Sequence, residues 1–177
     1  MKGTVRTVLA AAALAAALTP AGASAQWAPS SKFFGAHLGL SGVGSAPAIG
    51  LNGEFAYNDR IGIGAWLDTW SYGEEIGAGT AFTDWDVRYI ALAGTGAYHF
   101  AVASNPKWDP FLGLALGYYV VSTSVEGNNN IEYTGDANRI FLGGFGGTRY
   151  HFKENLSGVA RVGFGASYLT VGVDMKL

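Results

Sequence analysis

The sequence contains no cysteine and only five prolines, and 14% of its residues are charged. Without cysteine, the chain has neither a disulfide framework nor a lipid anchor attached to an N-terminal cysteine. The net charge of −2 argues against binding to nucleic acid, and we expect no nucleic-acid partner. Beyond residue 25, no apolar run reaches the roughly 20 residues that a membrane-spanning helix needs.

The first 25 residues have the features of a secretory signal peptide. Lys2 and Arg6 precede an uninterrupted apolar run over residues 8–18, and residues 23–25 carry the small side chains that a signal peptidase requires. The sequence therefore predicts cleavage after Ala25, a periplasmic lead-in of residues 26–32, and a single domain over residues 33–177. The mature chain would hold 9 basic and 13 acidic side chains, a net charge of −4.

Glycine and aromatic residues are abundant, and the last ten residues alternate strictly between apolar and other side chains. The apolar members are Leu169, Val171, Val173, Met175 and Leu177. A period of two predicts a strand with one face buried against a core or a bilayer.

The same alternation recurs along the chain and predicts eight strands. They cover residues 33–40, 48–57, 60–70, 86–100, 111–121, 139–152, 156–165 and 168–177. We expect short turns at 58–59, 103–110 and 153–155, longer loops at 41–47, 72–85 and 122–138, and a bend at 166–167. Short periplasmic turns that alternate with longer external loops are typical of outer-membrane barrels. The predicted fold is all-β, an eight-stranded antiparallel up-and-down transmembrane β-barrel with periplasmic N and C termini.

Charged residues within the strands predict which face meets lipid. A basic side chain on the lipid face near the bilayer midplane costs roughly 2–4 kcal/mol, and these charges all share a face with glycine and polar residues. We expect a polar cluster in the lumen, in which opposite charges pair, formed by Glu54, Asp68, Arg149, Arg161, Asp174 and Lys176. The lipid face would carry Leu38, Leu51, Ile63, Leu92, Leu114, Leu142, Val162 and Val171. A soluble secreted barrel such as a lipocalin would reverse the two faces.

Two groups of aromatic residues have distinct predicted places. A periplasmic aromatic belt at the membrane interface would contain Tyr57, Tyr98, Phe100, Tyr150 and Phe152. An apolar pocket in the outer half of the lumen would be lined by Trp66, Tyr89, Tyr119, Phe141 and Phe145. His37, His99 and His151 face inward in this scheme, and we interpret them as polar filling because no cysteine or clustered carboxylates accompany them.

The signal peptide, the Tyr98-His99-Phe100 triplet, residues 109–118 and the terminal alternating strand resemble the small eight-stranded outer-membrane β-barrels. That group includes the OmpW, OmpX/Ail and OmpA-type barrels, and the resemblance covers nearly the whole mature chain. It implies an outer-membrane location and contact with outer-membrane lipids and lipopolysaccharide. It also implies that the terminal strand carries the signal read by the barrel-assembly machinery, with Leu177 where the family usually has an aromatic residue. These motifs define an architecture and not an activity.

Two functional hypotheses follow. An OmpW-like barrel would bind or pass a small hydrophobic molecule in its apolar pocket. An OmpX/Ail-like barrel with a plugged lumen would act as a surface or structural protein through acidic external loops that contain Glu74, Glu75, Asp84, Glu126, Glu132 and Asp136. Those carboxylates match no calcium-loop spacing, so a solvated acidic surface is favoured over a cation site. No nucleophile motif such as G-x-S-x-G occurs, and we expect no enzymatic activity, no cofactor and no metal.

Overall fold

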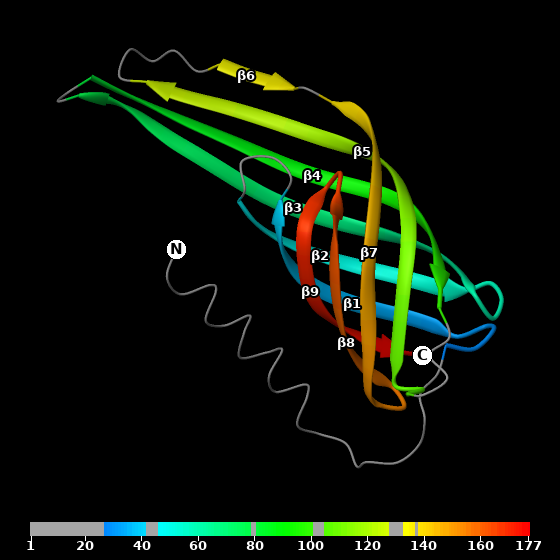
Figure 1. The fold of residues 1–177 in the computed structure, drawn as a ribbon. Helices are drawn as coiled ribbons and strands as arrows, with labels where there is room; N and C mark the ends of the chain where they lie inside the picture. The colour runs from blue at the N-terminus through cyan, green and yellow to red at the C-terminus, as the bar shows by residue number, and fades with distance from the viewer. Residues whose placement is uncertain (1–26, 42–45, 79–80, 101–104, 128–132, 137) are drawn as a thin grey trace.

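The computed structural model describes residues 27–41, 46–78, 81–100, 105–127, 133–136 and 138–177. One antiparallel sheet, rolled up on itself, contains all the strands (Figure 1). The strands are β1 Lys32–Ser41, β2 Pro47–Ala56, β3 Ile61–Ala78, β4 Ala81–His99, β5 Trp108–Gly127, β6 Tyr133–Asp136, β7 Arg139–Lys153, β8 Leu156–Phe164 and β9 Ser167–Lys176. Among the described residues, no helix is long and apolar enough to cross a membrane.

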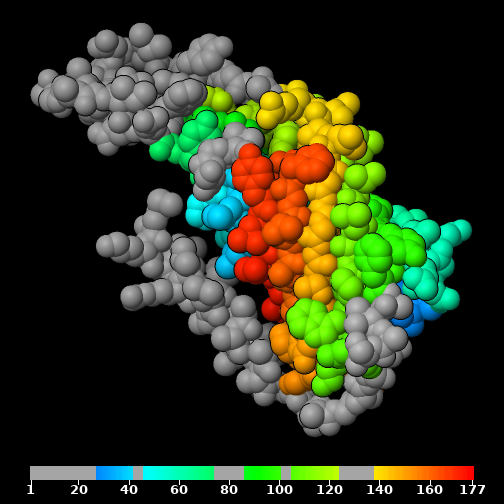
Figure 2. All heavy atoms as spheres, in the orientation of Figure 1, coloured from blue at the N-terminus to red at the C-terminus, as the bar shows by residue number. Residues whose placement is uncertain are grey.

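The sheet closes because β1 pairs with both β2 and β9, while β4 pairs with β5. β6 pairs with β5 over Ser122–Val125, and β7 pairs with the same edge of β5 over Trp108–Tyr119. β6 and β7 therefore count together as one of the eight strands around the barrel. Figure 2 shows β9, β8, β7 and β5 side by side as a continuous wall. The predicted closed eight-stranded antiparallel barrel is therefore confirmed.

Alternate side chains along each strand point to opposite faces of the wall. The outward side chains include all eight residues expected on the lipid face, and seven of them are exposed, with Leu114 at 65%. The charged side chains of Asp68, Arg149 and Asp174 are buried inside. This arrangement is the reverse of a lipocalin, in which the apolar face lines the interior.

The predicted loop at 72–85 is wrong, because most of it is strand. β3 and β4 pair continuously from Ile61↔Tyr98 to Ala78↔Ala81. Likewise, the predicted loop at 122–138 contains the end of β5, and β6 pairs with that end. These segments project beyond the barrel wall (Figure 1), and their backbone pairing identifies them as strands. The predicted turn at 103–110 is also too long, since β5 begins at Trp108.

The two ends of the barrel differ. One, the termini end, contains the start of β1, the C-terminal residue and the turns at 57–60 and 154–155. Leu177 N–H donates to Lys32 O at 2.8 Å there, which fastens the last residue to the first strand. The other, the hairpin end, contains the projecting β3–β4 pair and the tight bend after β8, where Gly165 adopts a φ of +107° that favours glycine. The predicted signal peptide lies outside the described residues.

Candidate functional site

A buried arginine organises the lumen near the termini end. Arg149 of β7 has 0% of its surface exposed, and its guanidinium contacts three carboxylates from three other strands. Nη2 donates to Glu54 Oε2 at 2.8 Å and to Asp174 Oδ2 at 2.9 Å, and Nη1 donates to Asp109 Oδ2 at 3.0 Å. Because β2, β5, β7 and β9 each contribute one group, this cluster ties together opposite walls of the barrel.

Aromatic rings surround the same guanidinium. The Arg149 Cζ lies 4.1 Å from the centroid of the Phe33 ring, and the rings of Phe111 and Trp27 are 5.9 and 6.0 Å away. A cation held over ring faces away from water gains electrostatic stabilisation beyond its ion pairs. The rings also keep water away from the ion pairs, which strengthens them.

His99 extends the cluster toward the mouth. Its Nδ1 lies 2.7 Å from Asp109 Oδ1, and its Nε2 lies 3.2 Å from Glu54 Oε1. The Trp27 ring stacks on the imidazole with centroids 3.5 Å apart. Trp27 Nε1–H in turn donates to Asn58 O at 2.9 Å. The segment before β1 therefore folds into the termini end and covers it.

A second polar group continues toward the hairpin end. Asn52 Nδ2–H donates to Asp174 Oδ1 at 3.0 Å, and Asn52 Oδ1 lies 3.1 Å from His37 Nδ1. The other imidazole nitrogen of His37 lies 2.6 Å from Asp68 Oδ1, whose second oxygen accepts from Ser167 Oγ at 3.2 Å. A hydrogen-bonded column thus runs from Asp109 at one end to Ser167 near the other.

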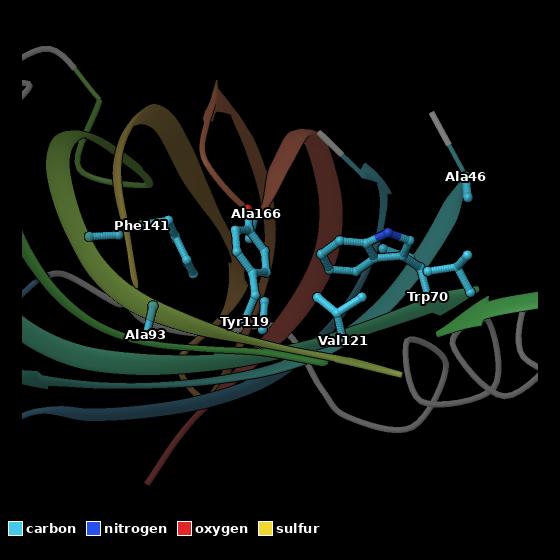
Figure 3. Close-up of a cluster of buried hydrophobic side chains, with 11 residues drawn as sticks. Ala46, Trp70, Ala93, Tyr119, Val121, Phe141 and Ala166 are labelled. Atoms are coloured by element: carbon cyan, nitrogen blue, oxygen red, sulfur yellow. The ribbon is translucent and has the colours of Figure 1, made fainter. Parts of the chain in front are cut away.

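Aromatic side chains fill the part of the lumen nearer the hairpin end. Tyr119 stacks on Phe141 with centroids 4.3 Å apart, and Trp70 stacks on Tyr89 at 5.1 Å. In Figure 3 the Tyr119 ring lies beside Ala166, with Phe141 and Trp70 on either side. The interior of an eight-stranded barrel is just wide enough for its own side chains to fill.

The residues of the predicted apolar pocket all face the lumen, but they pack against one another. Trp66 and Phe145 meet edge to face at 5.1 Å, and Tyr89 and Tyr119 do so at 6.4 Å. Two cavities border Trp66 and Phe145, and each has a volume of about 20 Å³. A ligand site for a small molecule typically needs about 300 Å³ or more, so these cavities are far too small for one.

The structure brings together only part of the predicted polar cluster. Glu54, Arg149 and Asp174 are in direct contact, and Asp68 joins them through Asn52 and His37. Lys176 lies at the mouth, opposite Phe33 in the β1–β9 register. Arg161 is buried but takes part in none of the ion pairs among the described residues.

The predicted polar cluster lacks Trp27, Asn52 and Asp109, and it also leaves out His37 and His99, which the sequence predicts only as inward polar filling. The sequence predicts a turn at Asp109, yet this residue lies on the inward face of β5, two residues before Phe111. The alternation Asp109, Phe111, Gly113 could have revealed it. The sequence predicts His99 on the inward face without a partner, because Glu54 comes from a strand distant in sequence and Asp109 is predicted in a turn.

The predicted aromatic belt lies on the outer surface at the termini end. Tyr98 meets Phe100 edge to face at 5.0 Å, and Tyr150 meets Phe152 in the same way at 5.3 Å. Trp108 packs on Tyr150 at 4.9 Å and extends the group. Inside the wall, His151 Nδ1 lies 2.7 Å from Ser157 Oγ, and both side chains are buried, which keeps this pair away from any substrate.

The described residues form no group of three or more His, Cys, Asp or Glu side chains arranged to hold a metal ion. The lumen of the described barrel is thus a filled polar and aromatic core, held mainly by ion pairs at one end and by ring packing at the other.

Comparison with solved structures places this fold among small outer-membrane barrels. The N-terminal β-barrel domain of Pseudomonas aeruginosa OprF matches with a TM-score of 0.58 and 15% identity, over 84% of this chain and 98% of that one. Ail of Yersinia pestis, solved with the heparin analogue sucrose octasulfate, matches with a TM-score of 0.52 and 13% identity, over 82% and 93%. Neisserial surface protein A matches with a TM-score of 0.50 and 17% identity, over 83% and 96%.

No protein-family model matches the sequence, and no curated protein matches it. At these identities the likeness concerns the fold. The chain therefore has the closed eight-stranded architecture that those outer-membrane barrels share.

Proposed function

We propose that this protein is a bacterial outer-membrane barrel with a closed lumen that acts at the cell surface through its projecting strands. One observation supports the proposal: the lumen is filled with side chains, whereas β3, β4 and β5 continue beyond the end of the barrel. β3, β4 and β5 have 18, 19 and 20 residues, whereas β1, β2 and β9 have 10 each. A spanning strand needs about 9–11 residues, so the surplus extends beyond a bilayer.

The outer surface supports the membrane location. Its large side chains at mid-height are aliphatic and exposed, as at Leu92, Leu114 and Leu142. A soluble protein rarely leaves so continuous an apolar surface in water. The aromatic belt at the termini end is the pattern expected where a barrel wall meets lipid headgroups. Outer-membrane lipids and lipopolysaccharide are therefore the partners proposed for this surface.

The projecting sheet offers one edge for a partner. The ladder between β2 and β3 ends at Ile49↔Thr69, whereas the ladder between β3 and β4 continues to Ala78↔Ala81. Residues 70–78 of β3 pair with β4 on one edge. Within the described part of the chain, no strand pairs with their other edge, which faces β2 in the earlier residues of β3. An exposed strand edge is a template for an added strand from another protein. We propose that this edge binds a protein segment in extended conformation.

An OmpW-like role in binding or passing hydrophobic molecules receives no support from the geometry. The rings that would line such a pocket occupy its space, and the two cavities that border both Trp66 and Phe145 hold about 20 Å³ each. The proposed barrel instead keeps its lumen closed, and its terminal strand β9 would carry the signal for the barrel-assembly machinery.

Fractionation and protease shaving of intact cells test the proposal. In a Gram-negative host, the protein should fractionate with outer membranes and migrate faster on a detergent gel before heating than after. External protease should cleave within residues 73–83 and leave the barrel protected. A protein found free in the periplasm, or protease-sensitive turns at 57–60 instead of the hairpin, would contradict the location or the orientation.

A further inference from the structure

Arg161 of β8 is a buried cation without a direct partner. It faces the lumen with 9% of its surface exposed, and its Nη1 has no hydrogen-bond partner. A guanidinium carries five N–H donors and cannot lose its charge in a protein. Buried polar groups that lack a partner among protein atoms are usually satisfied by ordered water. Arg161 therefore needs a hydrogen-bond acceptor that the surrounding protein atoms do not provide.

Two cavities flank its side chain. The first has a volume of about 20 Å³ and is bordered by Arg161, Trp66, Asp68 and Thr170 among others. The second has the same volume and is bordered by Arg161, Trp66, Glu54 and Thr95 among others. A cavity of roughly 10–15 Å³ or more has room for one water molecule. Each cavity is thus large enough for about one water, and several polar residues border it.

Two further buried polar atoms without a partner belong to residues that border these cavities. Trp66 Nε1 and Thr170 Oγ1 are buried and have no hydrogen-bond partner, and both residues border the first cavity. Trp66 also borders the second. Three residues that each carry an unsatisfied buried atom thus border one small cavity, which is unusual because nearly all buried polar atoms in folded proteins have a partner.

We propose that Arg161 holds two water molecules, one in each cavity, which bridge it to Asp68 on one side and to Glu54 on the other. Arg161 and Trp66 only donate hydrogen bonds, while the two carboxylates only accept them. The molecule between them must accept and donate at once, and water does both. A halide ion accepts only, and each cavity would place it beside a carboxylate. The waters connect Arg161 to the polar column, and this inference holds wherever the barrel resides.

A crystal structure of the full-length mature barrel from bromide-containing crystals tests the assignment directly. We expect a water peak in each cavity within hydrogen-bond distance of Arg161 and no anomalous bromide signal there. A bromide peak beside Arg161 would overturn the assignment in favour of an anion site. Empty cavities, or an Arg161 side chain in direct contact with Asp68 or Glu54, would also overturn it.

Nuclear magnetic resonance in detergent micelles provides a second readout with an internal control. The Trp66 indole N–H should show a cross-peak to a bound water. The Trp27 Nε1–H already donates to Asn58 O at 2.9 Å, so it should show none and serves as the control. Arg161→Met removes the donor shared by both sites, and the Trp66 cross-peak should then be lost. If the cross-peak keeps its wild-type intensity in that variant, Arg161 does not hold the waters.

Discussion

Arg149 and Asp174 form a two-point contact in which Nε and Nη2 both donate to Asp174 Oδ2, at 3.0 and 2.9 Å, and neither residue is exposed. The two residues come from β7 and β9, which flank β8 on either side. Their contact bridges over β8 on the lumen side of the wall, and the same guanidinium also holds Glu54 of β2 and Asp109 of β5. The closed state of the lumen therefore depends most on this arginine.

Replacing this arginine should strongly destabilise the barrel. Arg149→Met leaves three carboxylates buried without their cation, and breaking a buried pair in this way costs about 3–5 kcal/mol. The free energy of unfolding in urea, measured in lipid vesicles, gives the loss. Arg60→Met is the matched control, because the exposed Arg60 side chain contacts only the Tyr98 side chain among the described residues, and its effect should stay within about 0.5 kcal/mol. Equal stability of the two variants would contradict the role of Arg149.

Gly50 leaves the space that the His37–Asp68 pair occupies. A Cβ at position 50 would overlap both Asp68 Oδ1 and His37 Nε2. We expect Gly50→Ala to lower the free energy of unfolding by about 1–3 kcal/mol, the usual cost of overpacking. Gly94→Ala is the control, since a Cβ there would meet open space on the outer face. If Gly50→Ala unfolds at the same urea concentration as the control, the packing described around His37 is incorrect.

The apolar outer wall predicts a depth-dependent response to added charge. Leu114 lies midway along the membrane-facing part of β5 and is 65% exposed. Leu114→Lys should cost about 2–4 kcal/mol in folding from urea into vesicles, whereas Tyr57→Lys at the termini end should cost about 0–1 kcal/mol. A barrel that tolerates lysine equally at both positions would not have this face in lipid.

Trp27 should hold the segment before β1 in the mouth of the barrel. Its ring stacks on His99, and the following residues reach β2 through Ala56 N–H donating to Ser31 O at 2.9 Å. Aromatic contacts of this kind contribute about 0.5–1.5 kcal/mol. Trp27→Ala should therefore raise the hydrogen-exchange rate of the Ala56 amide by up to about tenfold.

Trp27→Phe separates the stacking from the hydrogen bond to Asn58, because phenylalanine keeps an aromatic face and loses the indole N–H. Its Ala56 amide should exchange at a rate between those of wild type and Trp27→Ala. An Ala56 amide that exchanges equally fast in all three proteins would show that Trp27 does not fasten the segment.

The sequence was sufficient to predict the closed barrel and the direction of its faces. Alternation between Leu114 and Ala115, or between Val171 and Gly172, is enough to separate an outer from an inner side chain wherever lipid or a core demands it. The same rule does not reach residues 72–78, because their sequence, Tyr-Gly-Glu-Glu-Ile-Gly-Ala, has no strict alternation of apolar and polar side chains.

Pairing inside the lumen could not be predicted for a different reason. Arg149 and Arg161 both face inward from neighbouring strands, but the register places Arg149 opposite Val159 and Arg161 opposite Gly147. Arg161 therefore occupies the next inward-facing position along β8, closer to the hairpin end than Arg149. Only the stagger of all the strands around the barrel, which composition does not reveal, decides that Glu54, Asp109 and Asp174 meet the first arginine and not the second.

Single-channel recording in a planar lipid bilayer tests the closed lumen most directly. The purified wild-type barrel should insert without a sustained ionic current, because ion pairs and stacked rings fill the interior between Trp27 and Trp70. Steady conductance from wild-type protein, with Arg149 and its three carboxylates intact, would contradict the account.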